Sequence, residues 1–289
     1  MNEDIITKAL IYDNQVQAIA VKSTNIVNKA IKIHNLSPVC SAALGRTLTV
    51  TAMMACNLKN KDENLSVTVK GGGPIGSIIT ACDGALNLRG YVDNPSIMLP
   101  LKSSGKLDVS GVVGSKGKLI VIKDIGLKSP YIGQSEIVSG EIAEDFANYF
   151  AISEQQPCLV ALGVLIGKDC NCISSGGLIL NILPDCSEEV ITKVEKCSSK
   201  LLNISDTLKD LSAKQFLNQL FTDDGIQFTE ELYPKYNCKC SNERIDRVIL
   251  SMGKEEAYKC LKEGELKVIC NFCNTEYKYD KKMLDALFN

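Results

Sequence analysis

The sequence predicts an α+β protein built from three consecutive parts. Short strands with alternating apolar residues, interrupted by a few helices, dominate residues 1–184, and such a mixture is typical of the α+β class. Amphipathic helical patterns follow in residues 185–230, and two close cysteine pairs mark residues 231–289. We therefore expect an N-terminal mixed α/β sheet domain, a helical connector and a small C-terminal metal-binding domain.

Length and composition limit the class of protein. The chain has 289 residues and a net charge of −2, which predicts neither a nucleic-acid partner nor attraction to a membrane surface. Its longest apolar run, Cys158–Gly167, is too short to span a bilayer. The N-terminal residues lack the basic segment of a signal peptide. We expect a cytoplasmic protein, in which thirteen cysteines favour metal binding or redox chemistry over permanent disulfides.

The first elements are two strands and two helices. Strands are expected over residues 7–12 and 15–21, joined by a turn at Asp13 and Asn14. A helix follows, with Ser23 or Thr24 as its N-cap. A second helix is expected over residues 39–58, with Ser37 as its cap and proline at the first helical position. Its many alanines predict close packing inside the core.

A glycine-rich loop follows the strand expected at residues 65–70. Residues 71–76 match the GxGxxG pattern of dinucleotide-binding proteins, but that motif needs a helix directly after it. Residues 77–82 are short and rich in β-branched side chains, and a turn at Asp83–Gly84 leads into another alternating run. We therefore predict a hairpin, in which the glycines serve a tight turn or bulge.

The rest of the first domain contains more strands and one helix. The helix is expected over residues 141–153, where apolar side chains recur at helical spacing. The expected strands are residues 106–109, 118–123, 133–138, 158–166 and 177–183.

The connector contains amphipathic helices. Ser212 and Gln215 form a capping box, and the helix that they open carries an apolar stripe of Phe216, Leu217, Leu220 and Phe221. Short helices cannot bury such a stripe alone, so they must dock on a neighbour. Two interpretations remain open, namely an ordinary helical hairpin between domains and a releasable cover over an apolar surface.

The C-terminal part contains the most specific motif. Cys238-Lys-Cys240 and Cys270-Asn-Phe-Cys273 are separated by 29 residues, a spacing that suits a tetrahedral Zn²⁺ site. Four thiolates leave no open coordination position, so such a site is structural; the alternative is four buried free thiols. Helices are expected over residues 245–252 and 255–263. Because fewer than sixty residues form a marginal core, zinc is expected to supply the missing stability.

The remaining candidate groups give weaker signals. Cys170 and Cys172 form a second CxC pair, Cys186 follows, and Cys260 lies between the two zinc pairs. These cysteines are either ordinary thiols of the core and turns or partners in a second metal site or disulfide exchange. His34 is the only histidine. No nucleophile stands out beside it, so we expect no enzyme, and we expect the histidine to stabilise the start of the Ser37 helix.

Nearly the whole chain resembles the 33 kDa chaperonin family of bacteria. The CxC and CxxC pairs are the most specific part of this resemblance. The other segments that carry it are His34–Pro38, Ala43–Thr47, Gly73–Gly76, Arg89–Tyr91, Asn94–Pro95, Ser139–Asp145, Tyr149–Phe150, Ser153–Gln155, Gly176–Gly177 and Leu183–Pro184.

The resemblance implies a redox-regulated, ATP-independent holdase. The reduced protein would hold zinc through Cys238, Cys240, Cys270 and Cys273 and be inactive. Oxidation would form the Cys238–Cys240 and Cys270–Cys273 disulfides, release the metal and unfold the module and connector. The exposed surface, often in a homodimer, would then hold unfolding clients. The apolar stripe of the connector supplies candidate client-binding residues.

Two other functions would use the same cysteines. A thiol–disulfide oxidoreductase would use Cys270 and Cys273, but its motif normally opens a helix after a strand, whereas the surroundings here predict a β-knuckle. A zinc-ribbon nucleic-acid binder would use the lysines of the module, among them Lys278, Lys281 and Lys282, although many glutamates accompany them.

Overall fold

The computed structural model describes residues 3–262 and 264–288. The chain forms two compact units, residues 1–236 and residues 237–289. The predicted α+β class is confirmed, because sheets and helices alternate along the chain and the cysteine pairs cluster in the C-terminal unit. The predicted domain boundaries at residues 184 and 230 stay a prediction. No helix in the described part of the chain is long and apolar enough to cross a membrane.

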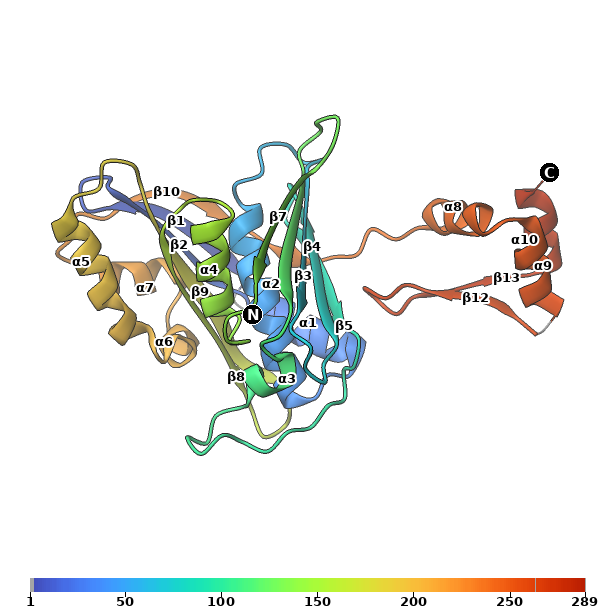
Figure 1. Ribbon diagram of the computed structural model, residues 1–289, viewed down its shortest axis with the longest axis horizontal. Helices are drawn as coiled ribbons and strands as arrows, with labels where there is room; N and C mark the ends of the chain where they lie inside the picture. The colour runs from blue at the N-terminus through green and yellow to red at the C-terminus, as the bar shows by residue number, and fades with distance from the viewer. Residues whose placement is uncertain (1–2, 263, 289) are drawn as a thin grey trace. The chain divides into compact units, whose positions relative to one another are not determined.

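The first sheet of residues 1–236 is buried on both faces. Its strand order is β10-β1-β2-β9-β8, and all its pairs are antiparallel. In β2, Ile19 and Val21 join one apolar cluster with the central helices, while Ala18 and Ala20 join another with the connector helices. Figure 1 shows helices on both sides of this sheet. The strands are β1 (Ile5–Ile11), β2 (Val16–Lys22), β8 (Cys158–Ile166), β9 (Cys172–Ile182) and β10 (Gln227–Leu232).

The second sheet has the order β11-β5-β4-β3-β6-β7. Its pairs are antiparallel except that β11 runs parallel to β5. In β3, Leu65, Val67 and Val69 are buried in the central cluster, and the alternating residues are less buried, as their period of two predicts. The strands are β3 (Asn64–Lys70), β4 (Ser77–Asp83), β5 (Asn87–Val92), β6 (Lys118–Asp124), β7 (Tyr131–Glu136) and β11 (Lys235–Tyr236).

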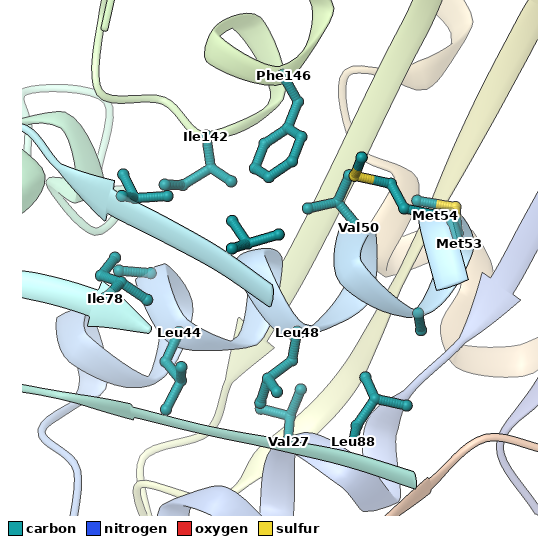
Figure 2. Close-up of a cluster of buried hydrophobic side chains, with 14 of the residues drawn as sticks. Val27, Leu44, Leu48, Val50, Met53, Met54, Ile78, Leu88, Ile142 and Phe146 are labelled. Carbon is teal, nitrogen blue, oxygen red and sulfur yellow. The ribbon is translucent and has the colours of Figure 1, made fainter. Parts of the chain in front are cut away.

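Helix α2 (Pro38–Ala55) lies between the two sheets and contacts both. Its cap is the predicted one, because the Ser37 side chain accepts a hydrogen bond from the Cys40 N–H. Figure 2 shows Leu44 and Leu48 on one side of this helix and Val50 pointing toward Phe146. The other helices of this core are α1 (Thr24–His34), α3 (Val109–Val113) and α4 (Ala143–Ile152).

The connector helices cover the other face of the first sheet. They are α5 (Glu188–Cys197), a 3₁₀ turn (Ser198–Leu201), α6 (Ile204–Asp210) and α7 (Ala213–Leu220). The predicted capping box is confirmed, because Ser212 and Gln215 exchange both of its hydrogen bonds. Helices α6 and α7 contact β9 and β2, so the connector is docked on the sheet in this structure.

Three sequence predictions are corrected. Residues 106–109 are not a strand, because the Asp108 side chain accepts a hydrogen bond from the Gly111 N–H and opens α3. Neither Ser23 nor Thr24 caps α1 through its side chain; Asp4 instead accepts the Asn25 and Ile26 N–H groups. The helix expected over residues 141–153 begins only at residue 143, since Ile142 has a φ of 45°.

The glycine-rich loop forms a tight turn, as predicted, in which the Gly76 N–H donates to the Gly73 oxygen at 3.1 Å, and it also packs closely against α3. A side chain at position 71 would lie 2.4 Å from the Gly114 oxygen, and one at position 73 would lie 2.4 Å from the Val112 oxygen. The loop therefore needs glycine to lie against the backbone of α3. The residues that follow form the predicted hairpin of β4 and β5, which leaves no helix N-terminus for a pyrophosphate.

The C-terminal unit has a small apolar core. Its buried members are Ile245, Ile249, Ala257, Leu266, Tyr279 and Leu284. Its elements are α8 (Asn242–Met252), α9 (Lys254–Lys262), β12 (Leu266–Ile269), β13 (Glu276–Tyr279) and α10 (Lys281–Leu287). Helix α8 ends at Gly253, as predicted, while Glu263, the expected last residue of the next helix, lies outside the described residues.

Candidate metal centre

Two short segments of the C-terminal unit bring the four cysteines together. Cys238 and Cys240 lie just before α8, whose cap is the side chain of Ser241. Cys270 and Cys273 lie in the turn between β12 and β13. That turn is closed by a hydrogen bond from the Cys270 N–H to the Thr275 oxygen, 3.0 Å long. The hairpin therefore presents both of its sulfurs from one tight turn, which is the predicted β-knuckle.

The four sulfur atoms have the spacing of a metal site. All of them lie within 4.8 Å of one another. The Cys238 and Cys270 Sγ atoms are 3.7 Å apart, and those of Cys240 and Cys273 are 3.3 Å apart. Zinc–sulfur bonds of about 2.3 Å in a tetrahedron place the sulfurs ~3.8 Å apart. All four are free thiols, so this donor set fits a metal ion.

Hydrogen bonds surround the sulfurs. The backbone N–H groups of Cys240, Phe272 and Thr275 bond to the sulfurs of Cys238, Cys270 and Cys273, respectively. The Tyr277 hydroxyl donates to the Cys240 sulfur at 3.1 Å. Such donors stabilise thiolates and orient them toward a metal.

The thiols differ in acidity. Burial raises the pKa of the Cys238 and Cys270 thiols, because a partly apolar environment opposes the charged form. Burial also opposes ionisation of Cys273, but hydrogen bonds from the Thr275 side chain and backbone outweigh it, and the pKa falls to about 7. Much of Cys273 is therefore thiolate at neutral pH, which is the form that binds metals and reacts with oxidants.

The other cysteines do not join this cluster. Cys172 is buried, Cys170 lies exposed in the turn before β9, and Cys186 is half-buried. Cys260 packs against the small core of the C-terminal unit. Across residues 3–262 and 264–288, no further group of three or more potential ligands comes together. The structure therefore favours ordinary thiols over a second metal site.

The apolar stripe of the connector is buried in this structure. Phe216 is 4% exposed, and Leu217 and Phe221 are 0% exposed. Leu220 is half-buried at the edge of the same cluster. Phe221 also packs edge-on against Tyr12, with the ring centroids 5.9 Å apart. In this arrangement three of the four candidate client-binding residues contact the sheet rather than solvent.

The sequence did not reveal the groups around the sulfurs. Tyr277 lies in a strand that also carries Tyr279, and nothing in the sequence distinguishes the tyrosine that reaches the sulfur from the one that bonds to Asp246. The ring Nε2 of His34 lies 3.2 Å from the Tyr236 hydroxyl, so His34 contacts β11. Its expected stabilisation of the start of α2 stays a prediction.

Known proteins are similar to this chain along almost its whole length. The family model described as "Hsp33 protein" matches residues 4–280. A 33 kDa chaperonin of Caldanaerobacter subterraneus is 44% identical, over 98% of this chain and 97% of the relative. A 33 kDa chaperonin of Staphylococcus aureus is 40% identical, over 99% and 98%. The crystal structure of the 33 kDa chaperonin from Thermotoga maritima superposes with a TM-score of 0.91 at 33% identity, covering 99% of this chain and 98% of that one.

Proposed function

This chain belongs to the Hsp33 family, and from that premise we propose that it is a redox-regulated, ATP-independent holdase. It acts as a chaperone rather than as an enzyme, and it prevents the aggregation of unfolding proteins under oxidative and heat stress. Its partners are unfolded or oxidatively damaged proteins, and it forms a homodimer when oxidised. It works in the cytoplasm without nucleic-acid or membrane partners, which its net charge of −2 supports.

In the reduced protein, Cys238, Cys240, Cys270 and Cys273 hold one Zn²⁺ ion. The metal supplies the cohesion that the small core of the C-terminal unit lacks. A structural zinc site contributes roughly 10–16 kcal/mol, which matches or exceeds the roughly 5–15 kcal/mol of a whole domain. The amide groups and the Tyr277 hydroxyl keep the four sulfurs oriented as thiolates.

Peroxide converts the four thiolates to two disulfides. Each disulfide forms when two thiolates lose two electrons to one hydrogen peroxide, which takes up two protons and leaves as two water molecules. Bridges between Cys238 and Cys240 and between Cys270 and Cys273 remove all four ligands, so the zinc leaves. The CxC bridge is the more strained of the two and is therefore easier to reduce, which suits a reversible switch.

Loss of the metal unfolds the C-terminal unit and releases the connector. The surface uncovered is the face of the first sheet beneath α5, α6 and α7. Its strands contribute Val16, Ala18, Ala20, Leu178 and Leu180, all buried under those helices. The apolar stripe of the connector, Phe216, Leu217, Leu220 and Phe221, is uncovered at the same time. Together they form an apolar surface for clients.

The convergence of the four sulfurs is the observation that carries this proposal. The test measures bound zinc and the suppression of thermal aggregation of a client protein, before and after peroxide. Wild-type protein is expected to hold one zinc and be idle when reduced, and to lose the metal and become active when oxidised. Cys270→Ser is expected to bind zinc poorly and to be active without oxidation.

Cys260→Ser is the matched control, because Cys260 lies in the same unit outside the sulfur cluster. It should behave like the wild type. Equal activity of the reduced and oxidised wild type would refute the switch, and inactivity of both would refute the chaperone itself.

A further inference from the structure

Strand β8 is an unusual edge strand. Within residues 3–262 and 264–288 it pairs only with β9, and it ends the first sheet. Its sequence, Cys158-Leu-Val-Ala-Leu-Gly-Val-Leu-Ile166, has no charged residue. Natural sheets normally protect such an edge with charges, proline or a bulge, because an apolar edge is a template for another strand. Here the only irregularity lies at its end, between Leu165 and Ile166.

The hydrogen-bond register identifies the outward groups of this edge. The Ser23 N–H donates to the Ser175 oxygen at 2.9 Å, and the Ile182 N–H donates to the Pro157 oxygen at 3.1 Å. Successive residues of an antiparallel strand bond to opposite sides. The backbone groups of Ala161 and Gly163 therefore bond to β9, and those of Leu162 and Val164 point away from the sheet.

A cavity of about 500 Å³ lies along this edge. Residues 162–168 of β8 and its turn form one side, the loop at residues 101–107 a second, and residues 202–206 of the connector a third. The lining is largely apolar, with Leu107 and Ile204 among its side chains. A hydrogen bond of 3.2 Å from Lys106 Nζ to Asn203 Oδ1 joins the loop to the connector across it.

We propose that the outer edge of β8 accepts an extended apolar segment of an unfolded client protein as an additional strand of the sheet. Unpaired backbone donors and acceptors bind any extended chain regardless of its sequence, and apolar walls select its side chains. Among the described residues of the lining, three are cationic, Arg46, Lys106 and Lys168, and one is a carboxylate, Asp206, so the flanks of the bound segment are neutral or acidic. Because the connector forms one wall, its release opens the edge.

This inference rests on the proposed function, and it goes further by naming the backbone groups that bind the client. The probe is a peptide of eight alternating valines and leucines with a glutamate at each end. A second peptide of the same sequence carries N-methyl groups on alternate amides, so it lacks half of the backbone N–H groups that could donate to the edge of β8. Oxidised full-length protein is expected to bind the first peptide at least tenfold more tightly.

Amide hydrogen exchange locates the bound peptide. Binding is expected to slow exchange at least tenfold at Leu162 and Val164, whose N–H groups point outward. Gly163 lies between them, already bonds to β9 and should not change. Equal protection of all three amides, or of none, would overturn strand addition, and so would equal affinity for the two peptides.

A variant tests the edge in the chaperone assay. Leu162→Pro removes one outward donor and leaves the ladder to β9 intact, so oxidised protein should suppress aggregation several-fold less. Leu162→Val keeps the amide and is the control. If Leu162→Pro is as active as wild type, the edge proposal fails while the holdase function stands; if wild type suppresses no aggregation in either redox form, the proposed function itself fails. Protection of Leu162 in oxidised protein alone that disappears on dilution would assign the edge to a second copy of the chain and overturn the client proposal.

Discussion

Phe221→Ala should activate the chaperone without oxidation. The Phe221 ring is fully buried between the connector and the first sheet, and it packs edge-on against Tyr12 at 5.9 Å with an interplanar angle of 82°. Truncating a buried phenylalanine to alanine costs about 3–5 kcal/mol. That cost favours the undocked connector by roughly 10²–10⁴-fold. The variant is thus expected to expose the apolar face of the sheet while its zinc is still bound.

The assay compares aggregation suppression by reduced, zinc-loaded proteins, with protease cleavage in residues 198–226 as a measure of undocking. Phe146→Ala is the control, because Phe146 is equally buried but belongs to the central core rather than to the connector. It should lower overall stability without activating the protein at a temperature where it stays folded. If Phe221→Ala keeps its zinc, becomes cleavable and still suppresses no aggregation, the covered face is not the client surface.

Three further outcomes follow from single contacts. Tyr277→Phe removes the hydroxyl that donates to Cys240 and should weaken zinc binding about 10–100-fold in a chelator competition. The control is Tyr258→Phe, which removes only a hydrogen bond to Asp285 and should leave zinc affinity unchanged. Burial raises the pKa of Asp4 to about 6 despite its hydrogen bonds to α1. Because Asp4 holds its proton more tightly in the folded protein, its contribution to the free energy of unfolding is fully present below about pH 4. This contribution is lost as the pH rises through 6. Urea unfolding should show that Asp4→Asn removes this pH-dependent loss, which is on the order of 3 kcal/mol. Gly163→Ala would place a Cβ 2.7 Å from the Ser205 nitrogen at the start of α6. The connector should therefore be partly undocked, and a protease should cleave it faster than in the wild type.

The clustering of the four cysteines was predictable because each pair is a short local motif. Each pair of cysteines lies within four residues of sequence, and thiolate spacing is a strong constraint on what a chain can bind. The caps at Ser37 and Ser212 were predictable for the same reason, since each bonds to an amide three residues later. The alternation in β3 predicted its buried face correctly, because one side of that sheet covers the central helix.

The features that the sequence missed depend on distant partners. Asp4 caps α1 from more than twenty residues away, and no local pattern distinguishes this carboxylate from a solvated one. Strand β10 was missed because its central residues, Thr229, Glu230 and Glu231, are exposed and polar, so it lacks the alternation that marks a strand. It forms only because the edge of β1 is available to it. Residues 106–109 alternate like a strand, but the Asp108 side chain favours a helical turn.

The segment between the connector and the cysteine cluster consists of two short strands, β10 and β11. Two residues before Cys238, Tyr236 holds β11 in place, with its hydroxyl donating to the Gly90 oxygen at 2.9 Å and lying 3.2 Å from His34. Strand β11 is only two residues long, and β10 before it is an exposed edge strand with an irregular register. Short exposed elements open at a small fraction of the free energy of global unfolding. In the proposed switch, the chain that leads back to α7 is held by Tyr236, the β10 ladder and two ion pairs, Lys8–Glu230 and Lys214–Glu231. The stabilisation that zinc supplies in the proposed switch is thus connected to the docked connector through contacts weak enough to open without unfolding the central core.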